Sequence, residues 1–318
     1  MTTTTSRSAI AATGLRKSFG GNVVLDGIDL DVAEGTIFAL LGPNGAGKTT
    51  AVQILSTLIG FDGGQVRVAG HDLSRDPDAV RAVIGVTGQF SAVDNLLTGE
   101  ENLRLMADLR HLGRAEGRVR SARLLEQFDL VEAGTKPAST YSGGMRRRLD
   151  LAMTLVGDPR IIFLDEPTTG LDPRSRLTMW QIVRDLAADG VTIFLTTQNL
   201  DEADQLAGRI AVLDEGRLIA EGSPGELKRR ISGGHIRLQF TDLQGLEAAE
   251  DALGGSTRDD EALALQIPGG GDVRSLRTLL AQLDGASIEV ESLSLHTPDL
   301  DDVFLALTGQ PEHEREAV

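Results

Sequence analysis

The sequence predicts an α/β fold whose main sheet is mostly parallel, followed by a second, smaller α/β unit. Apolar runs of strand length alternate with segments of helical periodicity between about residues 36 and 225. A glycine-rich loop joins the apolar run 36–41 to the next helical segment, and Ser-Gly-Gly at 232–234 precedes a further series of strands and helices. Because strands that alternate with helices form parallel sheets covered on both faces, these observations together predict the fold.

The first elements are predicted from alternation and turns. Residues 9–31 alternate apolar and polar side chains around the turn at 19–22, which predicts two paired strands. After the buried strand 36–41 come a helix over 48–58 and a turn with an edge strand over 63–69. We therefore expect an antiparallel β edge beside the parallel sheet.

A helical insertion then interrupts the alternation. A buried strand over 84–89 precedes it, and apolar residues at three- and four-residue spacing extend from 99 to 157. Alternation resumes with strands 160–164, 191–196, 209–213 and 218–220 and with helices 173–188 and 200–206. The second unit is predicted from strands 235–240, 262–267 and 287–293 and helices 243–253, 273–283 and 300–307.

These elements predict two folded domains and two tails. The predicted ranges are a disordered tail at 1–8, the main domain at 9–231 with its helical subdomain at about 90–158, an accessory domain at 232–310 and a flexible tail at 311–318.

Composition excludes several classes of protein. The 318 residues include no cysteine, which excludes disulfides and thiolate metal sites, and the five histidines show no ligand spacing. No apolar run approaches the about 20 residues of a membrane helix. The first eight residues lack the apolar core of a secretory signal, so we expect a cytoplasmic location. Residues 232–318 carry −12 of the net charge of −16, which is unfavourable for binding nucleic acid or an anionic lipid surface.

The glycine-rich loop fits the pattern G-x-x-x-x-G-K-[ST], in which backbone N–H groups bind phosphate. Its residues are Gly42, Pro43, Asn44, Gly45, Ala46, Gly47, Lys48, Thr49 and Thr50. Glycines let successive N–H groups point into one concavity, where the following helix adds its positive dipole end. We expect Lys48 to reach the β- and γ-phosphates, and the Thr49 hydroxyl to complete a Mg²⁺ shell of phosphate oxygens and water. The simpler interpretation is a glycine-rich turn before a helix.

Two adjacent carboxylates follow the buried strand 160–164. In an enzyme with such a phosphate loop, we expect Asp165 to hold Mg²⁺, usually through water, and Glu166 to polarise the water that attacks the γ-phosphate. An apolar strand that ends in Asp-Glu also fits a charge pair at a helix N-terminus. The phosphate loop upstream favours the catalytic interpretation.

A third motif runs from Tyr141 through Ser142, Gly143 and Gly144 into a predicted helix. Its N–H groups can meet an anion, although Ser142 also fits a simple N-cap, with the two glycines after it making a tight turn. In this order with the other motifs, the segment resembles the signature sequence of ATP-binding cassette (ABC) proteins. The resemblance covers nearly all of residues 9–225.

The resemblance assigns roles to further residues. Phe19 stands where the family has an aromatic ring that stacks on adenine, although it also fits a half-buried residue at a strand end. Gln89 resembles the glutamine that contacts Mg²⁺ and the attacking water. Residues 97–103 resemble the region that docks on a transmembrane partner, and the loop around Asp172 resembles the one that crosses to the opposite subunit.

Gln198 departs from the family pattern, because most cassettes have histidine at this position. A glutamine amide can donate a hydrogen bond to a γ-phosphate oxygen but cannot carry a proton. Together with the closing segment 300–309, Gln198 resembles the daunorubicin/doxorubicin-resistance subfamily of exporter ATPases. We therefore expect the donor role to suffice, in preference to a weakly hydrolysing regulatory cassette.

The resemblance implies an ATPase that binds ATP and Mg²⁺ between two copies of the chain. The phosphate loop of one copy binds ATP, and Ser142, Gly143 and Gly144 of the other close over the γ-phosphate. Hydrolysis is expected to drive a separate transmembrane permease that exports a hydrophobic compound, with drugs or antibiotics as the leading class. The chain would then lie at the cytoplasmic face of the cell membrane. The main alternative is an ABC protein that acts on ribosomes or DNA.

Overall fold

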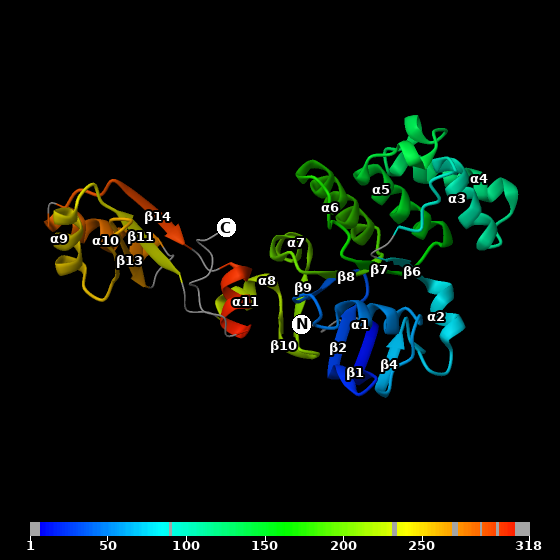
Figure 1. Cartoon of the computed structure of the whole chain (residues 1–318), viewed down its shortest axis with the longest axis horizontal. Coiled ribbons are helices and arrows are strands. Elements are labelled where there is room, and N and C mark those ends of the chain that lie inside the picture. Colours follow the sequence, from blue (N-terminus) through cyan, green and yellow to red (C-terminus); the bar gives the residue numbers. More distant parts are fainter. Residues whose placement is uncertain are drawn as a thin grey trace, which may run out of the picture. The chain divides into compact units, whose positions relative to one another are not determined.

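In the computed structural model the chain forms two compact units, Met1–Pro224 and Gly225–Val318 (Figure 1). The structure describes residues 7–88, 91–230, 234–268, 273–286, 288–296 and 299–308. The predicted tail at 311–318 and most of the predicted tail at 1–8 lie outside these ranges, and Ser8 already begins the first strand. The domain boundaries inferred from the sequence remain predictions.

A six-stranded sheet forms the centre of the first unit. Its strands are β3 (Ile37–Leu41), β6 (Ile84–Thr87), β7 (Ile161–Asp165), β8 (Thr192–Thr197), β9 (Arg209–Asp214) and β10 (Arg217–Gly222). They lie in the order β10-β9-β3-β8-β7-β6, and all neighbours are parallel except β10, which pairs antiparallel with β9. β3, β7 and β8 are buried along their whole length, as expected for parallel strands covered on both faces. The predicted parallel sheet is confirmed.

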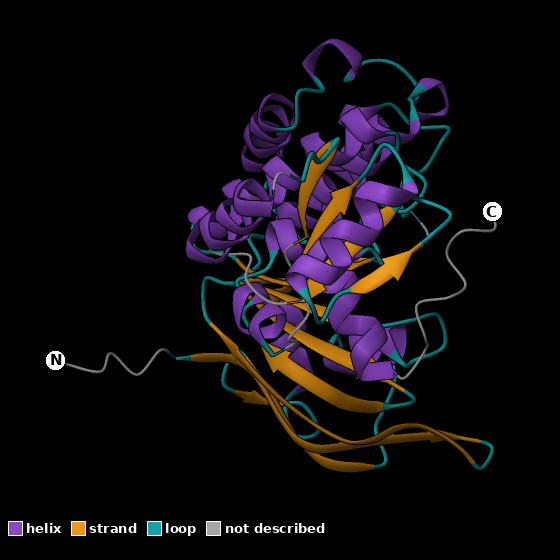
Figure 2. Cartoon of the chain, turned by 90° about the vertical axis from the view of Figure 1, so that its left-hand side faces the viewer, coloured by secondary structure: helices purple, strands orange, loops and turns teal. Residues whose placement is uncertain are grey.

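The predicted antiparallel edge is a sheet of its own. It contains β1 (Ser8–Phe19), β2 (Asn22–Ala33), β4 (Gly63–Val68) and β5 (His71–Asp72), in the order β2-β1-β4-β5. Its long bent strands lie at the bottom of Figure 2. The prediction of β4 as an edge strand is wrong, because β5 pairs with its outer side. A strand of two residues carries no periodicity that a sequence could reveal.

Seven α-helices belong to the described part of the first unit. They are α1 (Lys48–Leu55), α2 (Pro77–Val83), α3 (Gly99–Leu109), α4 (Arg114–Gln127), α5 (Gly143–Thr154), α6 (Pro173–Ala188) and α7 (Leu200–Leu206). α1 is shorter than predicted because Thr57 adopts a φ of 66°, which stops a helix. The sequence analysis missed α2, which begins at an Asp76 side chain that caps Ala79 N–H.

The predicted helical insertion is present and is made of α3, α4, α5 and three short 3₁₀ turns. α3 begins at a capping box in which Thr98 and Glu101 each satisfy the other's backbone N–H. α3 packs against both α4 and α5 (Figure 1). α5 thereby belongs to a packed helical layer, while Thr154 at its C-terminal end touches β6 of the central sheet, with its hydroxyl 3.0 Å from that of Thr87.

Three phenylalanines on neighbouring strands form the centre of the main core. Phe38 stacks on Phe194 with ring centroids 5.5 Å apart, and Phe194 meets Phe163 at 5.6 Å. Each is at most 1% exposed. Because they lie on β3, β8 and β7, they fix the spacing of the three strands whose ends carry the polar motifs.

The second unit contains a four-stranded antiparallel sheet. Strands β11 (His235–Gln239), β12 (Thr257–Asp259), β13 (Ala264–Pro268) and β14 (Ser292–His296) lie in the order β12-β13-β11-β14. Helix α9 (Leu243–Leu253) follows β11 and α10 (Val273–Ala286) follows β13, which gives the chain order βαββαβ of ferredoxin-like units. The unit also contains α8 (Pro224–Arg229), whose first residue closes the preceding unit, and α11 (Leu300–Thr308).

Two strands of this unit differ from the prediction. β12 was missed because its three residues are too few for a pattern. The strand predicted at 287–293 instead begins at Ser292. Ile288 and Val290 pack against the apolar core without pairing, so their alternation indicates burial and not a ladder.

Replacing Phe194 by alanine should destabilise the protein strongly, because it empties the centre of a core in which three strands meet. We expect the free energy of unfolding to fall by about 3–5 kcal/mol in urea titrations. Phe19→Ala serves as the control, since Phe19 is 49% exposed and its loss should change stability by about 0.5 kcal/mol or less. Equal losses in both variants would contradict this description of the core.

Candidate nucleotide-binding and catalytic site

The phosphate loop lies between the buried strand β3 and helix α1. Gly47 is the N-cap of α1 and has a φ of 107°, a backbone conformation that residues other than glycine rarely adopt. A Cβ on Gly42 would lie 2.2 Å from the carbonyl oxygen of Leu213 on β9. Glycine is therefore required at position 47 for its backbone conformation and at position 42 for close packing against β9.

Lys48 is buried at the start of α1, with 5% of its surface exposed. Its Nζ donates to the carbonyl oxygens of Gly42 at 2.7 Å and Pro43 at 2.9 Å, and lies 3.7 Å from Glu166 Oε1. Burial lowers the pKa of Lys48, while the charges of Glu166 and Asp165 oppose that shift. The ammonium is thus held inside the loop by groups that a phosphate can replace.

Asp165 ends β7 and is 4% exposed. Its Oδ1 accepts a hydrogen bond from Thr196 Oγ1 at 2.5 Å and another from Thr49 Oγ1 at 3.3 Å. The first helical turn after the phosphate loop and the ends of two neighbouring strands therefore meet at one carboxylate. A carboxylate and a hydroxyl are the hard oxygen donors that Mg²⁺ prefers, so the residues present fit this ion.

Glu166 follows in a left-handed conformation, with a φ of 48°. Its N–H donates to the carbonyl oxygen of Thr196 at 3.1 Å, and Thr169 Oγ1 donates to its Oε2 at 3.2 Å. A non-glycine residue in this region carries strain that the surrounding structure must hold. In this conformation the Glu166 carboxylate lies beside Lys48.

Gln198 follows β8 directly and is exposed. The carbonyl oxygen of Thr197 before it accepts the N–H of Gly42 at 3.3 Å, so this strand end is joined to the phosphate loop. Asn199 behind it caps α7 by accepting from Glu202 N–H at 3.1 Å. Gln89, the other predicted glutamine of the site, lies outside the described residues.

The signature residues lie at the start of α5. Ser142 is an exposed N-cap that accepts from Met145 N–H at 3.2 Å, and Gly143 is exposed beside it. A Cβ on Gly144 would lie 2.4 Å from Ser175 Oγ, and Ser175 in turn donates to Asp172, the N-cap of α6. Within the described ranges, no hydrogen bond or ion pair joins these residues to the phosphate loop. Within one copy of the chain, the contacts of Ser142 are those of an N-cap.

Phe19 lies at the end of β1, with 49% of its surface exposed. The Lys17 ammonium lies 5.0 Å from the centre of its ring, a distance at which a cation is attracted to an aromatic face. The ring is therefore accessible, although nothing in a single copy distinguishes adenine stacking from an ordinary strand end.

Two polar residues next to the site were given no role of their own from the sequence. Thr196 and Glu202 belong to the segment 196–204 around Gln198, which resembles the family's switch region, but only Gln198 was assigned a function. The Thr196 hydroxyl makes the shorter of the two hydrogen bonds to Asp165 Oδ1. Glu202, 1% exposed, accepts from Thr168 Oγ1 at 2.7 Å and Trp180 Nε1 at 3.1 Å. Neither spacing nor type marks these residues, because their partners are 22 to 34 positions away in the chain.

Comparison with known proteins identifies the family. A sequence model of the ABC transporter family matches residues 25–169. A daunorubicin resistance ATP-binding protein of Streptomyces coeruleorubidus is 48% identical over 314 residues, which cover 97% of this chain and 98% of that protein. The chain belongs to the ABC transporter family. The predicted family and an ATPase activity of the ABC type are therefore confirmed.

Other relatives of this ABC protein are named for drug resistance or for export. A daunorubicin/doxorubicin resistance ATP-binding protein of Streptomyces peucetius is 49% identical, covering 96% of this chain and 94% of that protein. A Nod factor export ATP-binding protein of a Rhizobium species is 36% identical over 96% of this chain and 98% of that protein. The prediction of an exporter's ATPase subunit is confirmed at this level.

Solved structures of ABC cassettes have the same fold. An ATP-binding subunit of an ABC transporter aligns with a TM-score of 0.63 and 27% identity, over 70% of this chain and 93% of that chain. A cassette solved as a dimer in a post-hydrolysis state with ADP and Pi aligns with a TM-score of 0.61 and 26% identity, over 67% and 98% of the two chains. This ABC protein binds adenine nucleotides as its family does. Among the described residues, no helix is long and apolar enough to cross a membrane.

Thr196→Val should weaken the affinity for Mg²⁺ during ATP hydrolysis, because it keeps the side-chain shape and removes the hydroxyl that orients Asp165. We expect activity at limiting Mg²⁺ to fall about 10- to 100-fold. Thr196→Ser keeps the hydroxyl and should remain close to the parent. Mg²⁺ titrations of ATPase rate test this, and a valine variant equal to the serine variant would contradict it.

Proposed function

We propose that this chain is the ATP-hydrolysing subunit of an exporter that removes a hydrophobic compound, with drugs or antibiotics as the leading class. The observation that carries the proposal is the meeting of Lys48, Thr49, Asp165 and Glu166 at one place, inside a chain with near full-length relatives named for daunorubicin or doxorubicin resistance. Such a set of residues can bind a nucleoside triphosphate and activate water against it.

Each residue has a role that follows from its position. The loop Gly42–Thr50 presents N–H groups and the α1 N-terminus to the phosphates. Lys48 exchanges the carbonyl oxygens of Gly42 and Pro43 for phosphate oxygens. Thr49 and Asp165 would hold Mg²⁺, with Gln89 as the further ligand suggested by the family resemblance, and the ion supplies positive charge that offsets charge developing on the phosphates.

Glu166 is the general base in this proposal. Its left-handed backbone directs the carboxylate toward Lys48, and the bond from Thr169 holds one oxygen in place. Gln198, exposed at the end of the neighbouring strand, donates its amide to the γ-phosphate. Because glutamine cannot take up a proton, Glu166 alone accepts the proton of the attacking water.

We infer that the working site is formed by two copies of the chain. Gly144, next to Ser142 and Gly143, packs against Ser175, which is bonded to Asp172, but within the described ranges no hydrogen bond or ion pair joins these residues to their own phosphate loop. A second copy can bring them over the γ-phosphate, as the dimeric form of a solved cassette supports. Phe19 would stack on the adenine of its own copy.

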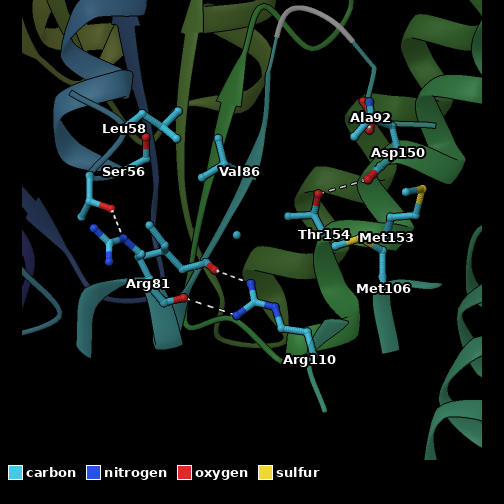
Figure 3. Close-up of a pocket in the computed structure, with 13 residues that line it drawn as sticks. Ser56, Leu58, Arg81, Val86, Ala92, Met106, Arg110, Asp150, Met153 and Thr154 are labelled. Carbon is cyan, nitrogen blue, oxygen red and sulfur yellow. Dashed lines mark hydrogen bonds between the residues drawn. The ribbon is translucent and has the colours of Figure 1, made fainter. Parts of the chain in front are cut away.

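The permease is proposed to dock where the helical layer meets the central sheet. A cavity of about 290 Å³ opens there, with walls from the end of α1, α2, β6, α3 and α5 (Figure 3). Leu58, Val86, Met106 and Met153 give it apolar walls, and Arg81 and Arg110 lie at one side. The segment 97–103, expected to dock from the sequence, overlaps the first turns of α3. The chain would lie at the membrane through this contact.

The alternative is an ABC protein that acts on ribosomes or nucleic acid. The acidic surplus of residues 232–318 counts against it. Sedimentation of the purified chain with ribosomes, and not with membranes that contain its permease, would favour this alternative.

Glu166→Gln should abolish ATP turnover by the purified chain with its permease while retaining ATP binding, because the amide cannot accept the proton of water. We expect a loss in kcat of at least about 100-fold with little change in KM for ATP. Gln198→His should leave turnover within a few-fold of the parent. A parent that is inert until Gln198 is replaced by histidine would instead favour a regulatory cassette.

A further inference from the structure

Arg147 lies in the second turn of α5, the helix that begins at the signature motif. All three of its nitrogens donate to backbone carbonyl oxygens that lie outside this helix. Nε donates to Pro167 at 2.9 Å, Nη1 to Gly88 at 2.9 Å and Nη2 to Asp165 at 3.1 Å. Its side chain is 12% exposed. One guanidinium thus joins α5 to the ends of both β6 and β7.

Asp150 lies on the same face of α5, three residues later. Its Oδ2 is 3.4 Å from Arg147 Nη1, and its Oδ1 accepts the N–H of Ala92 at 3.1 Å. Burial raises the pKa of Asp150, and the Ala92 N–H and the Arg147 charge act in the opposite direction. The pair therefore binds the chain at Gly88 and again at Ala92, on the two sides of residues 89–90.

The acceptors of Arg147 distinguish it from its neighbour. Arg148 also donates from α5 to backbone carbonyl oxygens, those of Phe128 at 2.8 Å and Asp129 at 3.2 Å. These acceptors belong to the turn after α4, within the helical layer. Two acceptors of Arg147 instead belong to the residues on either side of Glu166, namely Asp165 and Pro167. Its Nη2 also lies 3.4 Å from the Glu166 carbonyl oxygen. The two arginines make similar bonds to different parts of the molecule.

The hydrogen bonds of Arg147 stabilise the turn at Glu166, whose backbone is strained. Glu166 has a left-handed backbone, and reacting groups must stay within about 0.5 Å of the productive geometry. Asp150 is also one of the residues around the cavity of Figure 3, where Thr154 Oγ1 donates to its carbonyl oxygen at 3.1 Å. The pair thus spans from the cavity wall to the backbone of the two carboxylates.

We propose that Arg147 and Asp150 form a positioning pair that holds the Asp165–Pro167 backbone against α5, and so sets the rate of hydrolysis without taking part in nucleotide binding. This inference rests on the roles proposed above for Asp165 and Glu166. Arg147 touches neither nucleotide nor water in this proposal. It acts through the backbone that carries the reacting groups, because its donors are occupied by carbonyl oxygens.

The test compares Arg147→Met, Arg147→Lys and Asp150→Asn with Arg148→Met in the full-length chain, using Glu166→Gln as the reference for lost chemistry. Arg147→Met should lower kcat about 10- to 100-fold and leave KM for ATP within about twofold of the parent. Arg147→Lys keeps the charge but has one nitrogen for three acceptors, so its kcat should also stay low. Asp150→Asn should lower kcat by less.

Arg148→Met is the matched control, because it removes an arginine of similar burial from the same helix. It should keep the parental kcat even where its melting temperature falls as far as that of Arg147→Met. Equal losses of kcat in the two methionine variants, or a lysine or Asp150→Asn variant with parental kcat, would overturn the proposal. If Arg147→Met does not fold, the lysine variant decides. A Glu166→Gln variant that still hydrolyses ATP would show instead that the proposed role of Glu166 is wrong.

Discussion

The carboxylate of Asp165, buried at the end of an apolar strand, requires compensation that only residues from other parts of the chain can supply. A charge at 4% exposure is costly unless hydrogen bonds or opposite charge offset the loss of water. Thr196 and Thr49 donate to it, and the charge of Lys48 lies nearby. Each comes from the next strand or from the helix after the phosphate loop, so the order β3-β8-β7 of the sheet brings together the partners of this one group.

The site consists of a polar layer at the strand ends above an apolar layer of aromatic rings. The phenylalanines of β3, β7 and β8 pack below the strand ends and fix their spacing without competing for hydrogen bonds. Above them, threonine hydroxyls and backbone carbonyl oxygens satisfy the charged groups at short range. A buried ion site of this kind specifies one arrangement, because a shift of one strand leaves several polar groups without partners.

The sequence predicts the site better than it predicts the contacts that hold it. Lys48, Asp165 and Glu166 were predicted for the site because they stand in motifs of fixed residue type and spacing, and the alternation of strands and helices predicts that they lie at one edge of the sheet. The structure brings them together, and their roles stay predictions. Thr196 and Arg147 escaped, because their partners are distant in sequence and a threonine in a strand or an arginine in a helix is ordinary. β5 and β12 escaped for another reason: two or three residues hold too little periodicity. The role proposed for Ser142 depends on a second copy of the chain, so contacts within one copy do not reveal it.

The close approach of Gly42 to β9 joins the phosphate loop to that strand and to the turn that follows it. The Leu213 carbonyl oxygen fills the space where a Cβ would stand, and Gly216 N–H, in the turn after β9, donates to the Ala46 carbonyl oxygen at 3.2 Å. From that turn the chain runs through β10 and reaches Pro224, the last residue of the first unit, within a few residues. Because β10 pairs antiparallel with β9, it carries the chain back along the sheet until Gly222 lies opposite Ile210, at the other end of β9. The phosphate loop thus rests on β9 and its turn, and a displacement of β9 would reach the backbone that surrounds the phosphates.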